Sequence, residues 1–146
     1  MPLPRFLLLS MVVAFAPAAR SAGSGELLAG PVEVRVVSVL DGDTFRAEAH
    51  VWPGHHVTVN VRIRGIDAPE MKSRCDEERD AARAAREALA VMLGETVRIA
   101  NIAGAKYYGR VLADVATADG AGVADTMLGL HLVRRYDGGR RDSWCG

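Results

Sequence analysis

Acids and arginines gather in three short segments of the sequence, at places where turns and strand ends are expected. The segments are DGDT at 41–44, VRIRGIDAPE at 61–70 and KYYGR at 106–110. Asp-Gly is a common turn, so folding alone explains the first segment, although Asp43 adds a second acid directly after the turn. The second segment begins on a strand and ends with Asp67 and Glu70 around Pro69. The folding of strands and turns does not explain why acids and arginines occur together at these strand ends.

The chemistry that these residue types suit is the binding of a hard cation and a phosphate. Calcium is bound by carboxylate and carbonyl oxygens, and a guanidinium group donates a planar fork of hydrogen bonds to phosphate oxygens. A strand end that brings Arg62, Asp67 and Glu70 into one neighbourhood therefore predicts a cation site beside a phosphate-binding arginine. The third segment places Arg110 at the start of a strand, which by itself indicates little.

The segments that must position these residues read mainly as strands. Strands are predicted at 32–40, 44–49, 57–63, 96–102 and 110–117. The Asp41-Gly42 turn joins the first two into a hairpin. In the third, Val57, Val59, Val61 and Ile63 alternate with polar residues, so Arg62 projects from the polar face.

Two helices complete the predicted pattern. Residues 76–93 form a long amphipathic helix whose acidic first turn suits the helix dipole and whose end suits Gly94. Its predicted apolar face contains Ala82, Ala85, Leu89 and Met92. A short second helix carries Val123, Met127 and Leu130 and ends at Gly129. An α+β, mainly β fold follows, in which five strands form a small barrel, a long helix comes after the third strand and a short helix lies near the C-terminus.

The first residues differ from the rest of the chain. Arg5 precedes an apolar run at 6–19 that is shorter than the roughly 20 residues a membrane-spanning helix needs, and small residues follow it. This pattern predicts a signal peptide at 1–22, with cleavage between 18 and 23, and a folded domain at 32–146. The protein is then secreted or periplasmic, with no stable membrane insertion after processing. A retained N-terminal anchor is the alternative.

Composition and charge limit the classes of function. Of all residues, 49% are hydrophobic, which supplies an aliphatic core and argues against a disordered chain. The 18 Lys and Arg residues balance 18 Asp and Glu residues, so the net field attracts no polyanion. Contact with nucleic acid would depend on local basic groups such as Arg134, Arg135, Arg140 and Arg141 near the C-terminus. A solvated surface without function is the alternative interpretation of this basic cluster.

The sequence contains two cysteines, Cys75 and Cys145. In an oxidising compartment an even number of cysteines favours a disulfide, which here would fasten the C-terminus to the start of the long helix. Two free buried thiols are the alternative.

The order DGDT, VRIRGIDAPE, helix and KYYGR resembles the staphylococcal nuclease (thermonuclease) family. The closing segment GLHLVRRYDGGRRDSWC is similar to the C-terminal part of exported bacterial members, and the likeness extends over 34–145. Each motif alone is weak, but the ordered set is specific. The resemblance implies a five-stranded OB-fold barrel and a calcium-dependent phosphodiesterase.

The family pattern also implies a role for each matching residue. The carboxylates of Asp43 and Asp67 and the backbone carbonyl of Ala68 would bind one Ca²⁺ ion. Some members have threonine at the position of Ala68, but only the main-chain oxygen is a ligand. Glu70 matches the proposed general base, and Arg62 and Arg110 match the two arginines that hold the phosphate.

The KYYGR segment departs from the shorter K-Y-G-R form of the founding member by one residue. Lys106, Tyr107 and Tyr108 are expected to contact the substrate, and a tyrosine here would stack on a base or pack on the nucleoside. Plain packing of either tyrosine is the alternative.

The resemblance implies a nuclease that cleaves single- and double-stranded DNA and RNA with little sequence specificity and leaves 3′-phosphates. Nothing in the sequence demands more than a monomer. A rival hypothesis is a non-catalytic OB-fold module that binds nucleic acid, and a third is a calcium-stabilised structural domain. A binding module has no need of paired carboxylates, which repel phosphate, and a structural domain leaves the two arginines unused. The sequence therefore favours the enzyme.

Overall fold

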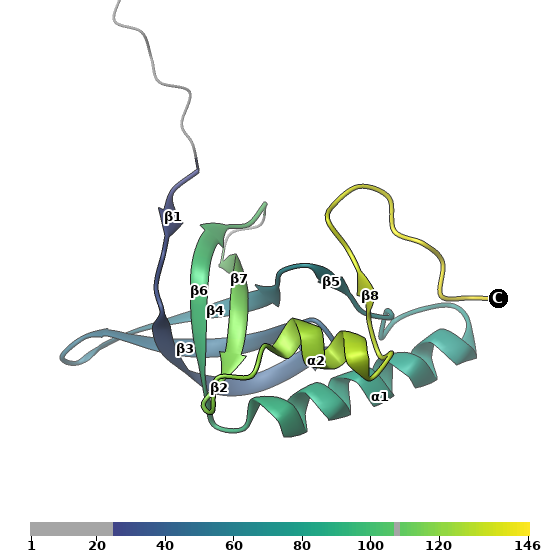
Figure 1. The fold of residues 1–146 in the computed structure, drawn as a ribbon, viewed down its shortest axis with the longest axis horizontal. Helices are drawn as coiled ribbons and strands as arrows, with labels where there is room; N and C mark the ends of the chain where they lie inside the picture. The colour runs from purple at the N-terminus through teal and green to yellow at the C-terminus, as the bar shows by residue number, and fades with distance from the viewer. Residues whose placement is uncertain (1–24, 107–108) are drawn as a thin grey trace, which may run out of the picture.

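The protein folds as a closed, five-stranded β-barrel with two helices, as the sequence predicts (Figure 1). A computed structural model describes residues 25–106 and 109–146, so the predicted signal peptide lies outside the described residues. The barrel strands are β2 (Val32–Asp41), β3 (Thr44–Trp52), β4 (His55–Ile63), β6 (Thr96–Gly104) and β7 (Arg110–Thr117). The helices are α1 (Asp76–Leu93) and α2 (Val123–Gly129). Three two-residue strands are β1 (Leu27–Leu28), β5 (Ile66–Asp67) and β8 (Arg134–Arg135).

One parallel pairing closes the barrel. Strands β2, β3 and β4 form consecutive antiparallel hairpins, and β6 pairs antiparallel with both β7 and β2. Strand β7 then lies parallel to β4, with Asn60 opposite Arg110 and Arg62 opposite Leu112. A parallel neighbour requires a long crossover connection, which α1 and β6 supply. The closure brings β4 and the start of β7, each carrying a predicted phosphate-binding arginine, side by side.

The barrel interior is apolar, and the predicted alternation of β4 holds where the strand faces that interior. Val61 and Ile63 are buried against Phe45 and Ala47 of β3. Val57, predicted on the same face, is instead 46% exposed. The β3–β4 hairpin extends beyond the barrel at the left of Figure 1, so none of the described residues covers its outer end.

Helix α1 runs along the bottom of the barrel in Figure 1 and has the predicted boundaries. Ala82, Ala85 and Leu89 are buried as expected, but Leu93, rather than Met92, completes the buried face. In α2, Val123 and Met127 are buried while Leu130 is 53% exposed, because the helix ends at Gly129 and the chain turns away. Within the described ranges neither helix has the length and hydropathy that a membrane span needs.

Candidate active site

The β2–β3 turn, the end of β4 and β5 meet on one side of the barrel. The β3–β4 register sets Thr44 opposite Arg62, and the backbone N–H of Ile63 donates to the carbonyl of Asp43 at 2.9 Å. Arg62 therefore lies beside Asp43 as a direct result of the hairpin. Its guanidinium forms an ion pair with that aspartate and donates through Nη2 to the carbonyl of Ile66 at 3.1 Å.

Asp43 is 3% exposed and is held by several donors. Thr44 Oγ1 donates to Oδ1 at 2.8 Å, and the backbone N–H of Ala68 donates to Oδ2 at 2.8 Å. Burial alone would raise the pKa of Asp43, but the charge of Arg62 and hydrogen bonds with the Asp41 side chain and the backbone N–H of Ala68 outweigh it and hold the pKa below its ordinary value. Asp43 is therefore a carboxylate at neutral pH.

Asp67 is also buried, and one of its oxygens is incompletely satisfied. Its Oδ1 lies 3.0 Å from Arg141 Nε and 3.6 Å from Arg62 Nη2, both as ionic contacts. Among the residues that the structure describes, none donates a hydrogen bond of acceptable geometry to this oxygen. A buried carboxylate oxygen with spare acceptor capacity beside a second carboxylate fits a hard cation. The donor set here is therefore compatible with Ca²⁺.

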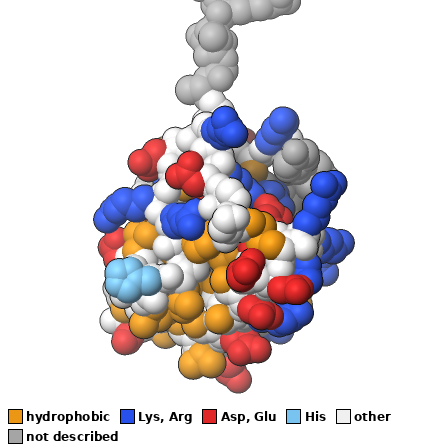
Figure 2. Space-filling view, turned by 90° about the vertical axis from the view of Figure 1, so that its right-hand side faces the viewer, with side chains coloured by type: hydrophobic (Ala, Val, Ile, Leu, Met, Phe, Trp, Pro, Cys, Tyr) orange, Lys and Arg blue, Asp and Glu red, His pale blue; other side chains and the backbone are white. Residues whose placement is uncertain are grey.

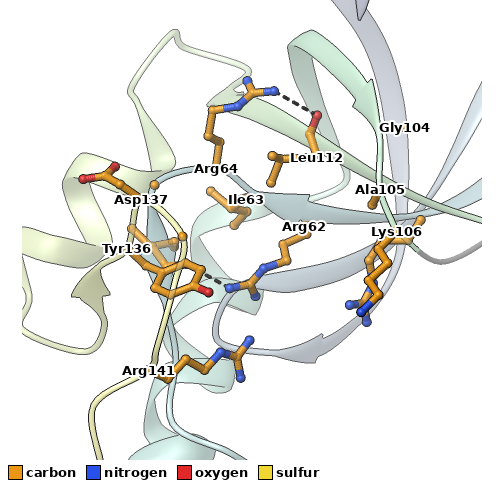
Figure 3. Close-up of a pocket in the computed structure, with 14 residues that line it drawn as sticks. Arg62, Ile63, Arg64, Gly104, Ala105, Lys106, Leu112, Tyr136, Asp137 and Arg141 are labelled. Atoms are coloured by element: carbon orange, nitrogen blue, oxygen red, sulfur yellow. Dashed lines mark hydrogen bonds between the residues drawn. The ribbon is translucent and has the colours of Figure 1, made fainter. Parts of the chain in front are cut away.

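A polar cleft of about 230 Å³ joins these groups. It is lined by Asp41, Asp43, Thr44, Arg62, Ala68, Pro69, Glu70, Arg110 and Arg141. Asp67 borders it through its contacts with two of these arginines. A neighbouring cavity of about 650 Å³ shares all three arginines and is lined in addition by Lys106 and Tyr136 (Figure 3). The geometry therefore brings together every predicted site residue that the structure describes. Tyr107 and Tyr108 lie outside the described residues.

The family model of staphylococcal nuclease homologues matches residues 60–137, more than half of the chain. The chain belongs to the staphylococcal nuclease family. The match contains Arg62, Asp67, Glu70 and Arg110, whereas Asp43 precedes it and Arg141 follows it. A search of curated proteins finds no match.

Asp41 and Arg141 were not predicted as residues of this nuclease-family site, although Arg141 is one of the basic C-terminal residues that were expected to attract nucleic acid. Asp41 lines the cleft, and its Oδ1 accepts the backbone N–H of Asp43 at 3.0 Å. Burial and the neighbouring charge of Asp43 raise the pKa of Asp41 to about 6. Asp41 belongs to the DGDT motif, two residues before Asp43, so the sequence could have predicted that it lies at the site. Arg141 is distant in sequence from the other residues of the cleft, and its position there follows only from the path of the folded C-terminal segment.

The turn that carries Glu70 is fixed by a buried acid at the start of α1. Glu78, predicted only as a partner of the helix dipole, is 7% exposed, and its Oε1 accepts the backbone N–H of Glu70 at 2.9 Å. Its Oε2 accepts from Ser73 Oγ at 2.5 Å. The side chain of Glu70 is mostly exposed and meets Arg141 Nη1 at 2.5 Å. The position of Glu70 therefore depends on the helix behind it.

The C-terminal segment of this family member is fastened at both ends. Strand β8 pairs with β5, and a disulfide joins Cys145 to Cys75, as the sequence indicates. Between them, Arg134 donates to the carbonyl of Ser143 at 2.9 Å and lies 3.8 Å from the centre of the Trp144 ring. In the described part of the chain, Glu78 and the two cysteine sulfurs also form a compact group. Sulfurs joined in a disulfide offer no thiolate to a metal.

Replacing both cysteines by alanine is expected to lower the free energy of unfolding by about 4 kcal/mol on the chain-entropy model, because the bond closes a large loop. The two cysteines are 70 residues apart in sequence. Urea unfolding of the Cys75→Ala, Cys145→Ala variant measures the loss. Reductant should destabilise the unmodified protein similarly and leave the variant unchanged. Equal stability of the two oxidised proteins would contradict the prediction.

Gly42 is expected to tolerate no side chain. A Cβ there would lie 2.6 Å from Ala85 Cβ and 2.9 Å from Ala68 Cβ, and neither methyl group can rotate away. We expect Gly42→Ala to cost about 1–3 kcal/mol by overpacking and to disturb the turn that carries Asp43. Urea unfolding measures it, with Gly129→Ala as control, since nothing lies within 4 Å of that Cβ. A Gly42→Ala loss no greater than the control's would show that the contact is not tight.

Proposed function

We propose that this protein is a calcium-dependent, exported nuclease that hydrolyses phosphodiester bonds of single- and double-stranded DNA and RNA and leaves 3′-phosphates. The observation that carries the proposal is the grouping of two buried carboxylates with the guanidinium groups of Arg62, Arg110 and Arg141 around one polar cleft. A charge pattern of this kind suits a cation and a phosphate together. Membership of a nuclease family supports the same reaction class.

The proposed cation is one Ca²⁺ ion, as the family generally uses. Asp43, Asp67 and the backbone carbonyl of Ala68 would hold it, and the unsatisfied Oδ1 of Asp67 supports this assignment. When bound, calcium would supply Lewis-acid polarisation and a template for the displacement at phosphorus.

Arg62 and Arg110 are proposed to bind the phosphate. In Arg62, Nη1 contacts Asp43 and Nη2 donates to Ile66. A guanidinium has five N–H donors, so donors remain for an oxygen in the cleft. Both arginines keep their charge as negative charge builds on the phosphate, which stabilises the transition state more than the ground state.

Glu70 is the proposed general base. Its carboxylate lies at the cleft, is largely exposed to water, and is held by Arg141. A base in this position would accept the proton of an attacking water. Lys106, which lines the larger cavity, is proposed to contact the nucleic acid, and the same role is proposed for Tyr107 and Tyr108 from their place in the KYYGR motif.

Export to the periplasm or the medium and a monomeric state belong to the same proposal. The disulfide supports an oxidising compartment. The protein is near neutral overall, so binding would depend on local charge. On the face drawn in Figure 2, basic side chains lie along the right edge, whereas basic and acidic side chains are mixed in the upper left part and further acidic side chains lie at the lower right.

Digestion of labelled oligonucleotides with purified protein tests the proposal. Single-stranded DNA, RNA and, more slowly, duplex DNA should be cleaved in calcium and persist in chelator. End-group analysis of the products should find 3′-phosphates. Equal persistence of every substrate in calcium and in chelator would reject the enzyme, and calcium-independent binding without cleavage would favour the binding module.

A further inference from the structure

A third arginine, from outside the part of the chain that the family model matches, reaches the acids of the site. Arg141 Nε lies 3.0 Å from Asp67 Oδ1, and its Nη1 lies 2.5 Å from Glu70 Oε1. It thus bridges the proposed cation ligand and the proposed base. A guanidinium group stays charged in proteins, so both contacts of Arg141 are ion pairs.

The fold holds Arg141 over the cleft. Before it, the backbone N–H of Tyr136 donates to the carbonyl of Gly65 at 2.9 Å, next to the β5–β8 ladder. After it, Cys145 is bonded to Cys75. A segment fixed on both sides loses little further entropy when its side chain binds a ligand. Figure 3 shows Arg62 and Arg141 extending from different elements toward the same space.

A cation on Asp67 and the guanidinium of Arg141 exclude each other. Both are positive, and Arg141 Nε contacts Asp67 Oδ1, the oxygen with spare acceptor capacity, so a cation on that oxygen would displace Nε. The side chain is 42% exposed and lines both the cleft and the larger cavity, so it has room to turn. A displaced guanidinium would then face any phosphate in the cleft.

We propose that Arg141 is a third phosphate-binding arginine. In the cation-free protein it forms ion pairs with Asp67 and Glu70, and it donates to the nucleic-acid backbone once a cation occupies Asp67. This inference rests on the proposed function of the site. It makes two predictions of opposite sign: removal of Arg141 strengthens the binding of calcium and weakens the binding of nucleic acid.

Calorimetric titration of calcium into the protein without nucleic acid tests the first sign. Arg141→Ala and Arg141→Gln should each bind Ca²⁺ several-fold more tightly than the unmodified protein, because no guanidinium competes for Asp67. Arg140→Ala is the matched control, since Arg140 has the same charge, belongs to the same segment and does not line either cavity. Its calcium affinity should not change.

Binding of a cleavage-resistant, phosphorothioate-linked single-stranded DNA tests the second sign. In calcium, both Arg141 variants should bind about 10-fold more weakly, as expected for the loss of one charge-assisted phosphate contact. In chelator they should bind like the Arg140→Ala control, because Arg141 is then held by the acids. Circular dichroism verifies that each variant is folded.

The outcomes separate this inference from the proposed function. Weaker binding of both calcium and DNA would assign Arg141 a structural role, and unchanged binding of either would also overturn the inference. An equal loss of DNA affinity in chelator and in calcium would show that ion pairs with Asp67 and Glu70 do not keep Arg141 from the nucleic acid in the cation-free protein. If the unmodified protein cleaves no DNA in calcium but the opposite signs are observed, hydrolysis fails and the Arg141 inference stands.

Discussion

Arg62→Ala is expected to lower the rate of phosphodiester cleavage in calcium by on the order of 1,000-fold or more. Arginines that stabilise the charge of a transferring phosphoryl group are worth several orders of magnitude in rate. Arg62 projects into the cleft from the end of β4, with its guanidinium fixed by Asp43 and the carbonyl of Ile66.

The same substitution is expected to affect stability in a cation-dependent way. The side chain of Arg62 is 14% exposed, and it neutralises Asp43 and Asp67, which are both buried. Its removal in chelator leaves two buried acids partly uncompensated, at a cost of about 3 kcal/mol. Calcium would neutralise the same acids, so most of that loss should be recovered when calcium is added.

Single-turnover cleavage in saturating calcium, with thermal unfolding recorded in calcium and in chelator, measures both effects. Arg46→Ala is the control, because Arg46 is exposed on the adjacent strand β3, bonds only Asn60 among the contacts described, and lies outside the cleft. The assigned role would be wrong if Arg62→Ala cleaves within tenfold of the unmodified rate. Equal destabilisation in calcium and in chelator would argue against a cation beside these acids.

The local part of the site could be predicted from the sequence because short-range backbone geometry fixes it. Asp43 follows a two-residue turn, and the hairpin register that this turn starts sets Thr44 opposite Arg62. The alternation on β4 likewise determines which side of the strand Arg62 takes. Where packing overrides the pattern the prediction is wrong, as at Val57, whose strand end extends past the barrel, and at Leu130, which follows the last turn of α2.

The contact between Arg141 and the acids of the site could not be predicted from the sequence. Arg141 reaches Asp67 only because β8, a strand of two residues, pairs with β5 and because a bond to Cys75 holds the chain end. A two-residue strand leaves no periodicity in a sequence. The burial of Glu78 could not be predicted either. An acid in the first turn of a helix is already explained by the helix dipole, so its sequence position gives no sign of a further role.

Asp67→Asn is expected to weaken calcium binding at least 100-fold and to reduce calcium-dependent cleavage accordingly. Even the outer partners of metal ligands are worth 10–100-fold in affinity, and this substitution removes a charged ligand itself. Without calcium the variant should be about as stable as the unmodified protein. Asparagine keeps the shape of the side chain, while Arg62 retains Asp43 and Arg141 retains Glu70.

The increase in stability on addition of calcium distinguishes a carboxylate that binds the ion from one that has only a structural role. A ligand at 100 times its Kd raises the free energy of unfolding by about 2.7 kcal/mol, and a 100-fold weaker site loses most of that gain. Asp114→Asn is the control, because Asp114 is also paired with an arginine, Arg64, but lies away from the cleft. Its calcium-induced rise in Tm should equal that of the unmodified protein. If Asp67→Asn keeps the full rise, Asp67 is not a ligand, and its two guanidinium contacts are structural ion pairs with no relation to a cation.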